Sequence, residues 1–201
     1  MSRDFEVFAL DMKGFGENAD MPYPYSLDDY VDEVKEFCYK NSIIRPHVIA
    51  HSFGARVAIK LAYNEPYFFD KMVLTGAAGL KPKRKAGHII KKSCFKVLKS
   101  FMPKEKLLKF YSPDYLKLSP IMKQSFIKIV NEHLDYALCG IKNKTLIVFG
   151  QNDKETPLYM AKRLNSGIKG SSLKIIKNAG HFAFIDKPLK FNMEVKEFLL
   201  S

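Results

Sequence analysis

The sequence has no tryptophan and only three cysteines among its 201 residues. Cys38, Cys94 and Cys139 are odd in number and widely spaced, which argues against a disulfide framework and against a zinc site. No apolar run approaches the roughly 18 residues that a membrane-spanning helix needs, and the residues after Met1 lack the apolar core of a secretory signal. We therefore expect a cytoplasmic protein in a reducing environment.

Acidic residues are also scarce, since 21 Asp and Glu stand against 33 Lys and Arg, a formal net charge of +12. The stretch from Leu80 to Ala137 holds 14 basic and four acidic residues, so it carries most of the excess. We favour a solvated basic face on surface helices, with a weak contact to an anionic membrane as the alternative. Nothing except the positive charge supports nucleic-acid binding, so no nucleic-acid partner is expected.

Short β-prone runs alternate with segments of helical periodicity, a pattern typical of an α/β fold with a mostly parallel sheet and flanking helices. Ser26 and Asp29 form a plausible capping start for the first helix. The predicted strands are Phe5–Leu10, His47–His51, Lys71–Thr75, Thr145–Phe149 and Leu173–Ile176. The predicted helices are Leu27–Lys40, a segment from Ser52 to about Pro66, Leu158–Leu164 and Leu189–Leu200.

This alternation stops between Leu80 and about Ile141, where only helical periodicity remains. Since strand patterns resume afterwards, the stretch is interpreted as an insert and not as a second domain. We expect residues 1–79 and 141–201 to form the core and residues 80–140 to form a helical cap. The apolar stripe of the cap is predicted to consist of Ile90, Cys94, Val97, Leu98 and Phe101.

Ser52 is the candidate nucleophile, at the centre of Ala50-His51-Ser52-Phe53-Gly54 and between a predicted strand and a predicted helix. Small residues two positions before and two after it permit a tight, strained turn that exposes the hydroxyl. A hydroxyl is a poor nucleophile at neutral pH, so it needs a base that a third group holds in place.

Asp153 and His181 are the candidates for that acid and base. Asp153 follows Phe149-Gly150-Gln151-Asn152 at the end of one predicted strand, and His181 follows Asn178-Ala179-Gly180 after the next. The carboxyl ends of parallel strands lie along one edge of a sheet, so these two residues and Ser52 can converge there.

In this order the motifs resemble those of the α/β-hydrolase superfamily of esterases, lipases and carbon–carbon-bond hydrolases. Asp11-Met12-Lys13-Gly14-Phe15-Gly16 is similar to the family's D-x-x-G-x-G loop, and Gly150–Asp153 with Thr156-Pro157 is similar to its acid loop. His51-Ser52-Phe53-Gly54 is similar to its nucleophile elbow, and Gly180-His181 to its base motif.

The resemblance implies a hydrolase of the carboxylic-ester type with the catalytic residues Ser52, Asp153 and His181. It implies that the backbone N–H of Phe53 is one oxyanion donor and that residues 80–140 shape the acyl pocket. It also implies a small-molecule acyl substrate and neither a metal nor a cofactor.

The family's first three strands have no counterpart, so the resemblance is to an N-terminally truncated α/β-hydrolase fold. In the family, the third strand separates the strands that correspond to Phe5–Leu10 and His47–His51, and the loop after it supplies a second oxyanion donor. Because buried unpaired backbone groups are costly, we expect Phe5–Leu10 to pair directly with His47–His51. Otherwise the incomplete sheet would take a strand from another copy and form an oligomer.

Several alternatives stay open. The chain could be a non-catalytic ligand-binding relative, or an inactive fragment that lacks a complete oxyanion hole. Glu155 and Asp186 are alternatives to Asp153 as the acid. Thioesters, lactones and β-diketone-type carbon–carbon bonds remain beside carboxylic esters as substrates. His51 is expected to pack beside the elbow, and Asp11 to order its own loop.

Overall fold

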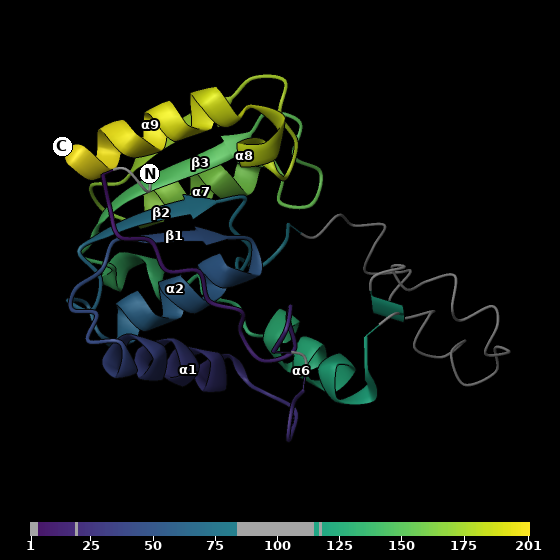
Figure 1. The fold of residues 1–201 in the computed structure, drawn as a ribbon. Coiled ribbons are helices and arrows are strands. Elements are labelled where there is room, and N and C mark those ends of the chain that lie inside the picture. Colours follow the sequence, from purple (N-terminus) through teal and green to yellow (C-terminus); the bar gives the residue numbers. More distant parts are fainter. Residues whose placement is uncertain (1–3, 19, 84–114, 117) are drawn as a thin grey trace, which may run out of the picture.

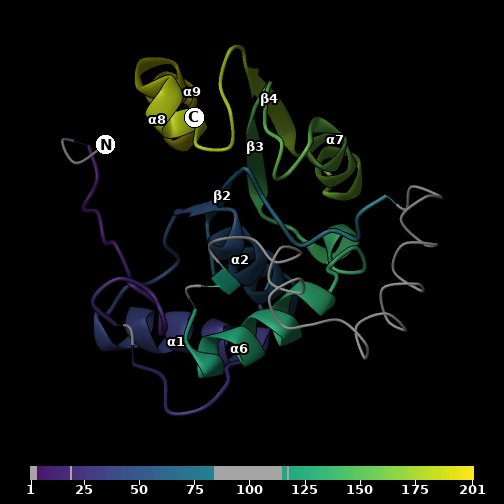
Figure 2. The ribbon, with the colours of Figure 1, turned by 90° about the vertical axis from the view of Figure 1, so that its right-hand side faces the viewer.

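The computed structural model describes residues 4–18, 20–83, 115–116 and 118–201, which adopt an α/β fold with helices on both faces of a parallel sheet (Figure 1, Figure 2). The sheet has the order β1-β2-β3-β4 and consists of β1 Val48–His51, β2 Lys71–Thr75, β3 Lys144–Gly150 and β4 Ser172–Ile176. The helices are α1 Leu27–Lys40, α2 Phe53–Asn64, α6 Pro120–Asn131, α7 Leu158–Gly167, α8 Ala183–Asp186 and α9 Pro188–Leu200, with a 3-10 turn at Leu138–Gly140. No helix among the described residues is long and apolar enough to cross a membrane.

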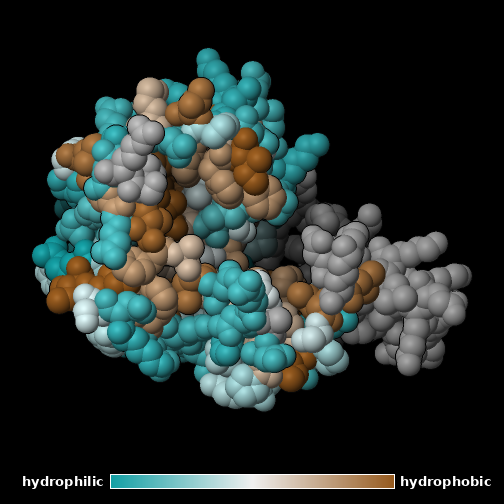
Figure 3. Space-filling view, viewed as in Figure 1, coloured by the Kyte–Doolittle hydropathy of each residue, from teal (hydrophilic) through white to brown (hydrophobic). Residues whose placement is uncertain are grey.

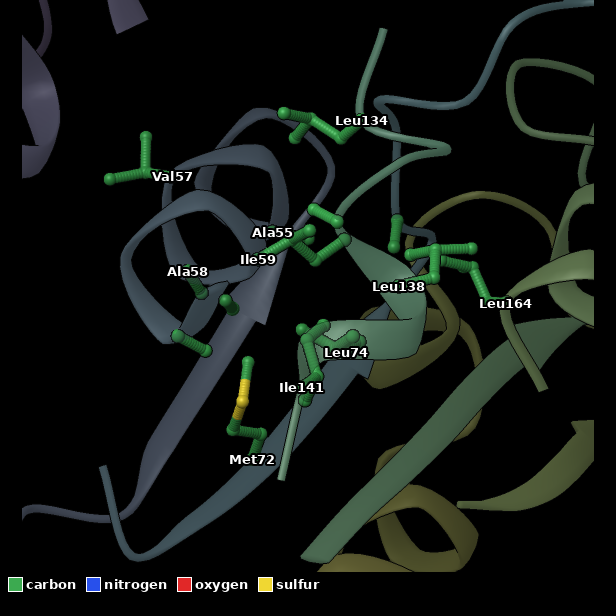
Figure 4. Close-up of a cluster of buried hydrophobic side chains, with 14 of the residues drawn as sticks. Ala55, Val57, Ala58, Ile59, Met72, Leu74, Leu134, Leu138, Ile141 and Leu164 are labelled. Carbon is green, nitrogen blue, oxygen red and sulfur yellow. The ribbon is translucent and has the colours of Figure 1, made fainter. Parts of the chain in front are cut away.

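The two central strands are buried on both faces, and their alternate side chains enter two different cores. Met72 and Leu74 of β2 lie in the larger core with α1, α2 and α7, whereas Val73 lies in the smaller core with α8 and α9. Figure 4 shows the larger core, where side chains of α2 face Met72, Leu74 and the chain from Leu134 to Ile141. The sheet therefore separates α8 and α9 from the other helices, as Figure 2 shows.

Helix α1 begins and ends where the sequence predicted. The Ser26 hydroxyl accepts from the Asp29 backbone N–H, and the Asp29 carboxylate accepts from the Ser26 N–H at 2.6 Å, which completes a capping box. Four of the five predicted strands are present within one residue of the predicted bounds at each end, and the helices predicted after Ser52, at Leu158 and at Leu189 are present too.

The described part of the predicted cap is helical around α6 and packs against α2. The Arg56 guanidinium, which is buried, donates to the carbonyl oxygens of Ile129 and Glu132 at 2.8 Å each. The Lys60 ammonium lies 2.6 Å from the Glu132 carboxylate. These contacts place cationic groups at the carboxyl end of α6, where they interact favourably with the helix dipole. The stripe predicted from Ile90 to Phe101 lies outside the described residues.

The prediction for Phe5–Leu10 was wrong: the segment is not a strand, and it does not pair with β1. Both of its ends are held by other elements. Asp4 forms an ion pair with Lys196 of α9 at 2.8 Å, and the Lys13 N–H donates to the Glu33 carboxylate of α1 at 3.0 Å. The segment therefore crosses the sheet edge from α9 to α1, as the purple chain in Figure 2 shows.

Between this segment and β1 lies a cavity of about 850 Å³. Its lining is mostly apolar and includes the whole segment from Phe5 to Leu10, all of β1, and side chains of α1 such as Val34 and Phe37. The expected closed sheet is thus replaced by an open slot at the β1 edge. The ends of the segment are held by α9 and α1 and not by the sheet, so it runs beside β1, with the Phe5 ring 5.9 Å from that of His47, without a backbone hydrogen bond to any described residue.

Candidate active site

Ser52 occupies a sharp turn between β1 and α2 with a left-handed backbone, at φ 48° and ψ −106°. Its N–H donates to the Thr75 carbonyl at 3.0 Å, and its carbonyl accepts from the Ala78 N–H at 3.3 Å. A positive φ at a residue other than glycine is strained, and such strain is concentrated at functional sites. The turn is therefore the nucleophile-elbow geometry that the sequence predicted around this serine.

Asp153 follows β3, and its side chain is completely buried. Its carboxylate accepts hydrogen bonds from the Glu155 N–H at 3.0 Å, the Thr156 N–H at 2.8 Å and the Thr156 hydroxyl at 2.8 Å. A buried carboxylate needs such donors because an unpaired charge away from water is very costly. Thr156 thereby fixes the orientation of the carboxylate.

His181 lies beside Asp153, with its Nδ1 2.9 Å from the Asp153 Oδ2. The side chain of His181 is 6% exposed, so this contact is shielded from water. The predicted pairing of these two residues is present. The alternative acid Asp186 does not take this place, because its carboxylate accepts from the Gly180 N–H at 2.7 Å and so shapes the loop that carries His181.

The second nitrogen of His181 faces another carboxylate. Its Nε2 lies 3.4 Å from the Glu155 Oε2, and the Glu155 side chain is 66% exposed. The sequence predicts that His181 reaches both Asp153 and Ser52, but no hydrogen bond joins the Ser52 hydroxyl to His181 within the described residues. Glu155, the alternative acid, instead lies on the side of the imidazole that a nucleophile would approach.

Ser52 and His181 nevertheless lie at the same edge of the sheet, around Gly76. Gly76 directly follows Thr75, the hydrogen-bond partner of Ser52, and has a φ of 49°. A Cβ added to Gly76 would lie 3.1 Å from Nδ1 and from Cε1 of His181. Glycine is therefore required here both by the backbone angle and by the close approach of the imidazole.

His51 packs beside the elbow, as predicted. Its ring centroid lies 4.6 Å from that of His181 and 5.1 Å from those of Phe182 and Phe184. The Nδ1 of His51 lies 3.1 Å from the Thr75 carbonyl, which makes it the protonated nitrogen of a neutral ring. Burial lowers the pKa of His51, and the neighbouring His181 lowers it further.

The remaining motif positions surround the first turn of α2. The Phe53 N–H makes no hydrogen bond to any described residue, as is usual for the first N–H groups of a helix. The ring of Phe53 stacks on Phe15 with centroids 5.3 Å apart. Asp11 orders its own loop, as expected, because its Oδ2 accepts from the Glu17 N–H at 3.3 Å. The D-x-x-G-x-G loop thus supports the elbow through Phe15.

The sequence analysis placed Thr156 in the acid loop but did not predict that it would bond to Asp153. A signal was available, because a threonine three residues after an aspartate commonly closes a local turn through its hydroxyl. Within the described residues, no group of three or more His, Cys, Asp or Glu side chains is arranged to hold a metal ion.

Comparison with known proteins places this chain among hydrolases. The "AB hydrolase superfamily protein YisY" of Bacillus subtilis is 28% identical over 220 residues, which cover 98% of this chain and 82% of the relative. A 2-hydroxy-6-oxononadienedioate/2-hydroxy-6-oxononatrienedioate hydrolase of Escherichia coli is 25% identical over 97% of this chain and 76% of its own length.

Solved structures agree with the fold. The meta-cleavage product hydrolase CumD of Pseudomonas fluorescens matches with a TM-score of 0.69 and 25% identity, over 94% of this chain and 77% of that one. An esterase of Exiguobacterium antarcticum matches with a TM-score of 0.73 and 22% identity, over 94% and 79%. The model of the family described as "serine aminopeptidase, S33" matches residues 1–188. The chain therefore belongs to this hydrolase family, within the α/β-hydrolase superfamily.

Proposed function

We propose that this chain is a serine hydrolase that cleaves a carboxylic ester of a small molecule, with Ser52, Asp153 and His181 as nucleophile, acid and base. The observation that carries the proposal is the buried contact of 2.9 Å between Asp153 and His181, at the same sheet edge as the strained turn of Ser52. An imidazole held by a buried carboxylate is the base that a serine hydroxyl needs.

In this mechanism the Nε2 of His181 takes the proton from the Ser52 hydroxyl as the oxygen attacks the acyl carbon. The resulting oxyanion lies near the first turn of α2, where the free N–H of Phe53 and the positive end of the helix stabilise it. The protonated imidazole then gives its proton to the leaving group. Water cleaves the acyl-enzyme by the same route in reverse, with Asp153 holding the imidazole throughout.

Glu155 must move before this step, because its carboxylate occupies the Nε2 side of His181. An ionised carboxylate accepts hydrogen bonds and does not donate them, so it cannot take the place of the Ser52 hydroxyl at Nε2. The exposed Glu155 side chain is free to turn toward water and release Nε2.

Carboxylic esters are the preferred substrate class because one matched structure is an esterase. The names of CumD and of the Escherichia coli relative favour a second candidate, hydrolysis of a carbon–carbon bond in a meta-cleavage product. Both reactions use an acyl carbon that a nucleophile attacks. We further propose that the basic residues 80–140 form a cap over this site and that no cofactor takes part.

A fluorophosphonate probe tests the proposal, since it reacts with an activated serine whatever the natural substrate. The wild-type chain should be labelled at Ser52, and Ser52→Ala should not be labelled while its circular dichroism spectrum stays unchanged. Ser42, which also has a positive φ, provides the matched control, and Ser42→Ala should be labelled like the wild type. A folded wild-type chain that resists the probe would favour the alternative of a non-catalytic, ligand-binding relative.

A further inference from the structure

The Thr156 side chain contacts both the candidate acid and the candidate base. Its hydroxyl oxygen lies 2.8 Å from the Oδ2 of Asp153 and 3.3 Å from the Nδ1 of His181. Since that Nδ1 lies 2.9 Å from the same Oδ2, the three atoms form a closed triangle. All three residues are buried.

The surroundings of this triangle are apolar. The ring centroid of Phe182 lies 5.2 Å from that of His181, and Figure 3 shows apolar surface over α8, which begins directly after Phe182. In surroundings of low dielectric constant a hydrogen bond is stronger than in water, and an unpaired polar group is more costly. The hydroxyl of Thr156 is therefore expected to matter more than a hydroxyl at the surface.

The chemistry of its neighbours sets the direction of the hydroxyl proton. An ionised carboxylate only accepts hydrogen bonds, so the hydroxyl donates to the Oδ2 of Asp153. A hydroxyl oxygen also has lone pairs that accept. The Nδ1–H of His181, which faces Asp153, thus has a second and longer acceptor in the oxygen of Thr156.

With Thr156 in place, both oxygens of Asp153 accept two hydrogen bonds. Oδ1 accepts from the backbone N–H groups of Glu155 and Thr156, and Oδ2 accepts from the Thr156 hydroxyl and from His181. A carboxylate has about four such acceptor positions. Among the described residues, removal of the hydroxyl would leave His181 as the single partner of Oδ2.

Thr156 is itself held firmly by the chain around it. A residue before a proline is restricted to extended conformations, and Pro157 follows it directly. Helix α7 begins at Leu158, and its residues Met160 and Leu164 are buried in the larger core. A β-branched side chain also has few rotamers. The hydroxyl is therefore fixed by α7 and not by a loose loop.

We propose that Thr156 is a positioning residue, whose hydroxyl holds the Asp153 carboxylate in the orientation that keeps a proton on the Nδ1 of His181 and leaves Nε2 as the base. The inference rests on the proposed function, because that reaction depends on the tautomer of the imidazole. The two backbone N–H groups bond to Oδ1 alone, so they do not replace the hydroxyl at Oδ2.

Fluorophosphonate labelling of the full chain tests this role. Thr156→Val keeps the shape of the side chain but removes the donor, and it should be labelled roughly 10–150-fold more slowly than the wild type, the range for a lost hydrogen bond to a charged group. Thr156→Ser keeps the hydroxyl and should restore most of the rate. Thr145→Val is the matched control, since Thr145 is also buried and its hydroxyl donates at 2.9 Å to the Asn143 carbonyl, at the start of β3. This control should be labelled like the wild type.

The NMR resonance of the Nδ1 proton of His181 provides a second readout, which needs no reaction. In the wild type this proton should exchange slowly with water, because it is buried between Asp153 and Thr156. In Thr156→Val the resonance should shift and the exchange should be faster, whereas Thr145→Val should match the wild type. A wild-type chain that resists the probe would contradict the proposed function, and the resonance would then decide the role of Thr156 alone.

Two results would overturn the positioning role. One is labelling of Thr156→Val at the wild-type rate, and the other is an Nδ1 proton resonance that is unchanged in this variant. If Thr156→Val does not fold, Thr156→Cys takes its place, because a thiol is a weak donor. Thr156→Cys should be labelled more slowly than Thr156→Ser, and equal rates would also overturn the proposal.

Discussion

Gly150→Ala should disrupt the contact between the strand that carries Asp153 and the loop that carries His181. A Cβ at position 150 would overlap the carbonyl oxygen of Gly180 and lie 2.5 Å from that of Ala179. Both obstacles are backbone atoms, so neither can move away as a flexible side chain could. Relief requires the loop to shift, which strains the hydrogen bond of 2.8 Å between the Asn152 N–H and the Ala179 carbonyl.

The expected cost combines overpacking, about 1–3 kcal/mol, with the loss of one or two backbone hydrogen bonds of about 1 kcal/mol each. We therefore expect the free energy of unfolding to fall by roughly 2–5 kcal/mol in urea denaturation. The labelling rate should fall as well, because the loop shift moves His181 away from Asp153. Gly54→Ala is the control for stability, since its Cβ would meet no atom within 4 Å. A Gly150→Ala variant as stable as the wild type would refute the close approach.

Three further predictions concern the site. Asp153→Asn should reduce the rate of fluorophosphonate labelling by about 10³–10⁴-fold, because the amide cannot hold the imidazole in the required tautomer. Glu155→Gln should raise the labelling rate by about 1.4–5-fold, the range for an exposed ion pair, because the neutral amide holds the Nε2 side of His181 less firmly, whereas Lys154→Gln should have no such effect. Burial lowers the pKa of His51, so its contribution to stability is present above about pH 6.5 and lost as the pH falls. Urea denaturation at pH 7 and pH 5 should thus show a smaller difference for His51→Gln than for the wild type.

Most of the sheet could be predicted because its signals are local. In β2 the residues Met72, Val73 and Leu74 are all apolar, which predicts a strand buried on both faces, and the two cores receive these side chains in alternation. The meeting of Asp153 with His181 followed from one general property, the alignment of carboxyl ends in a parallel sheet. Neither inference needed the positions of distant residues.

The N-terminal segment could not be predicted in the same way. The residues of Phe5–Leu10 favour an extended conformation, and the segment is accordingly not helical. Whether the segment forms a strand depends on a partner strand within hydrogen-bonding distance. The position of the segment relative to such a partner depends in turn on the contacts of Lys13 and Asp4 with α1 and α9. The position of the Glu155 carboxylate could not be predicted from the sequence either, because the direction of an exposed side chain depends on the folded conformation of its loop.

The sheet edge and the candidate site meet at the elbow. Asp153 extends from β3, which has hydrogen-bonded neighbours on both sides, and the loop of His181 is bonded to the end of that strand. Ser52 extends from β1, whose outer side borders the cavity. Within the sheet, the elbow is therefore hydrogen-bonded from the β2 side alone. In this site the acid and base are in contact, whereas the serine, on a strand that pairs on one side only, has no hydrogen bond to the base.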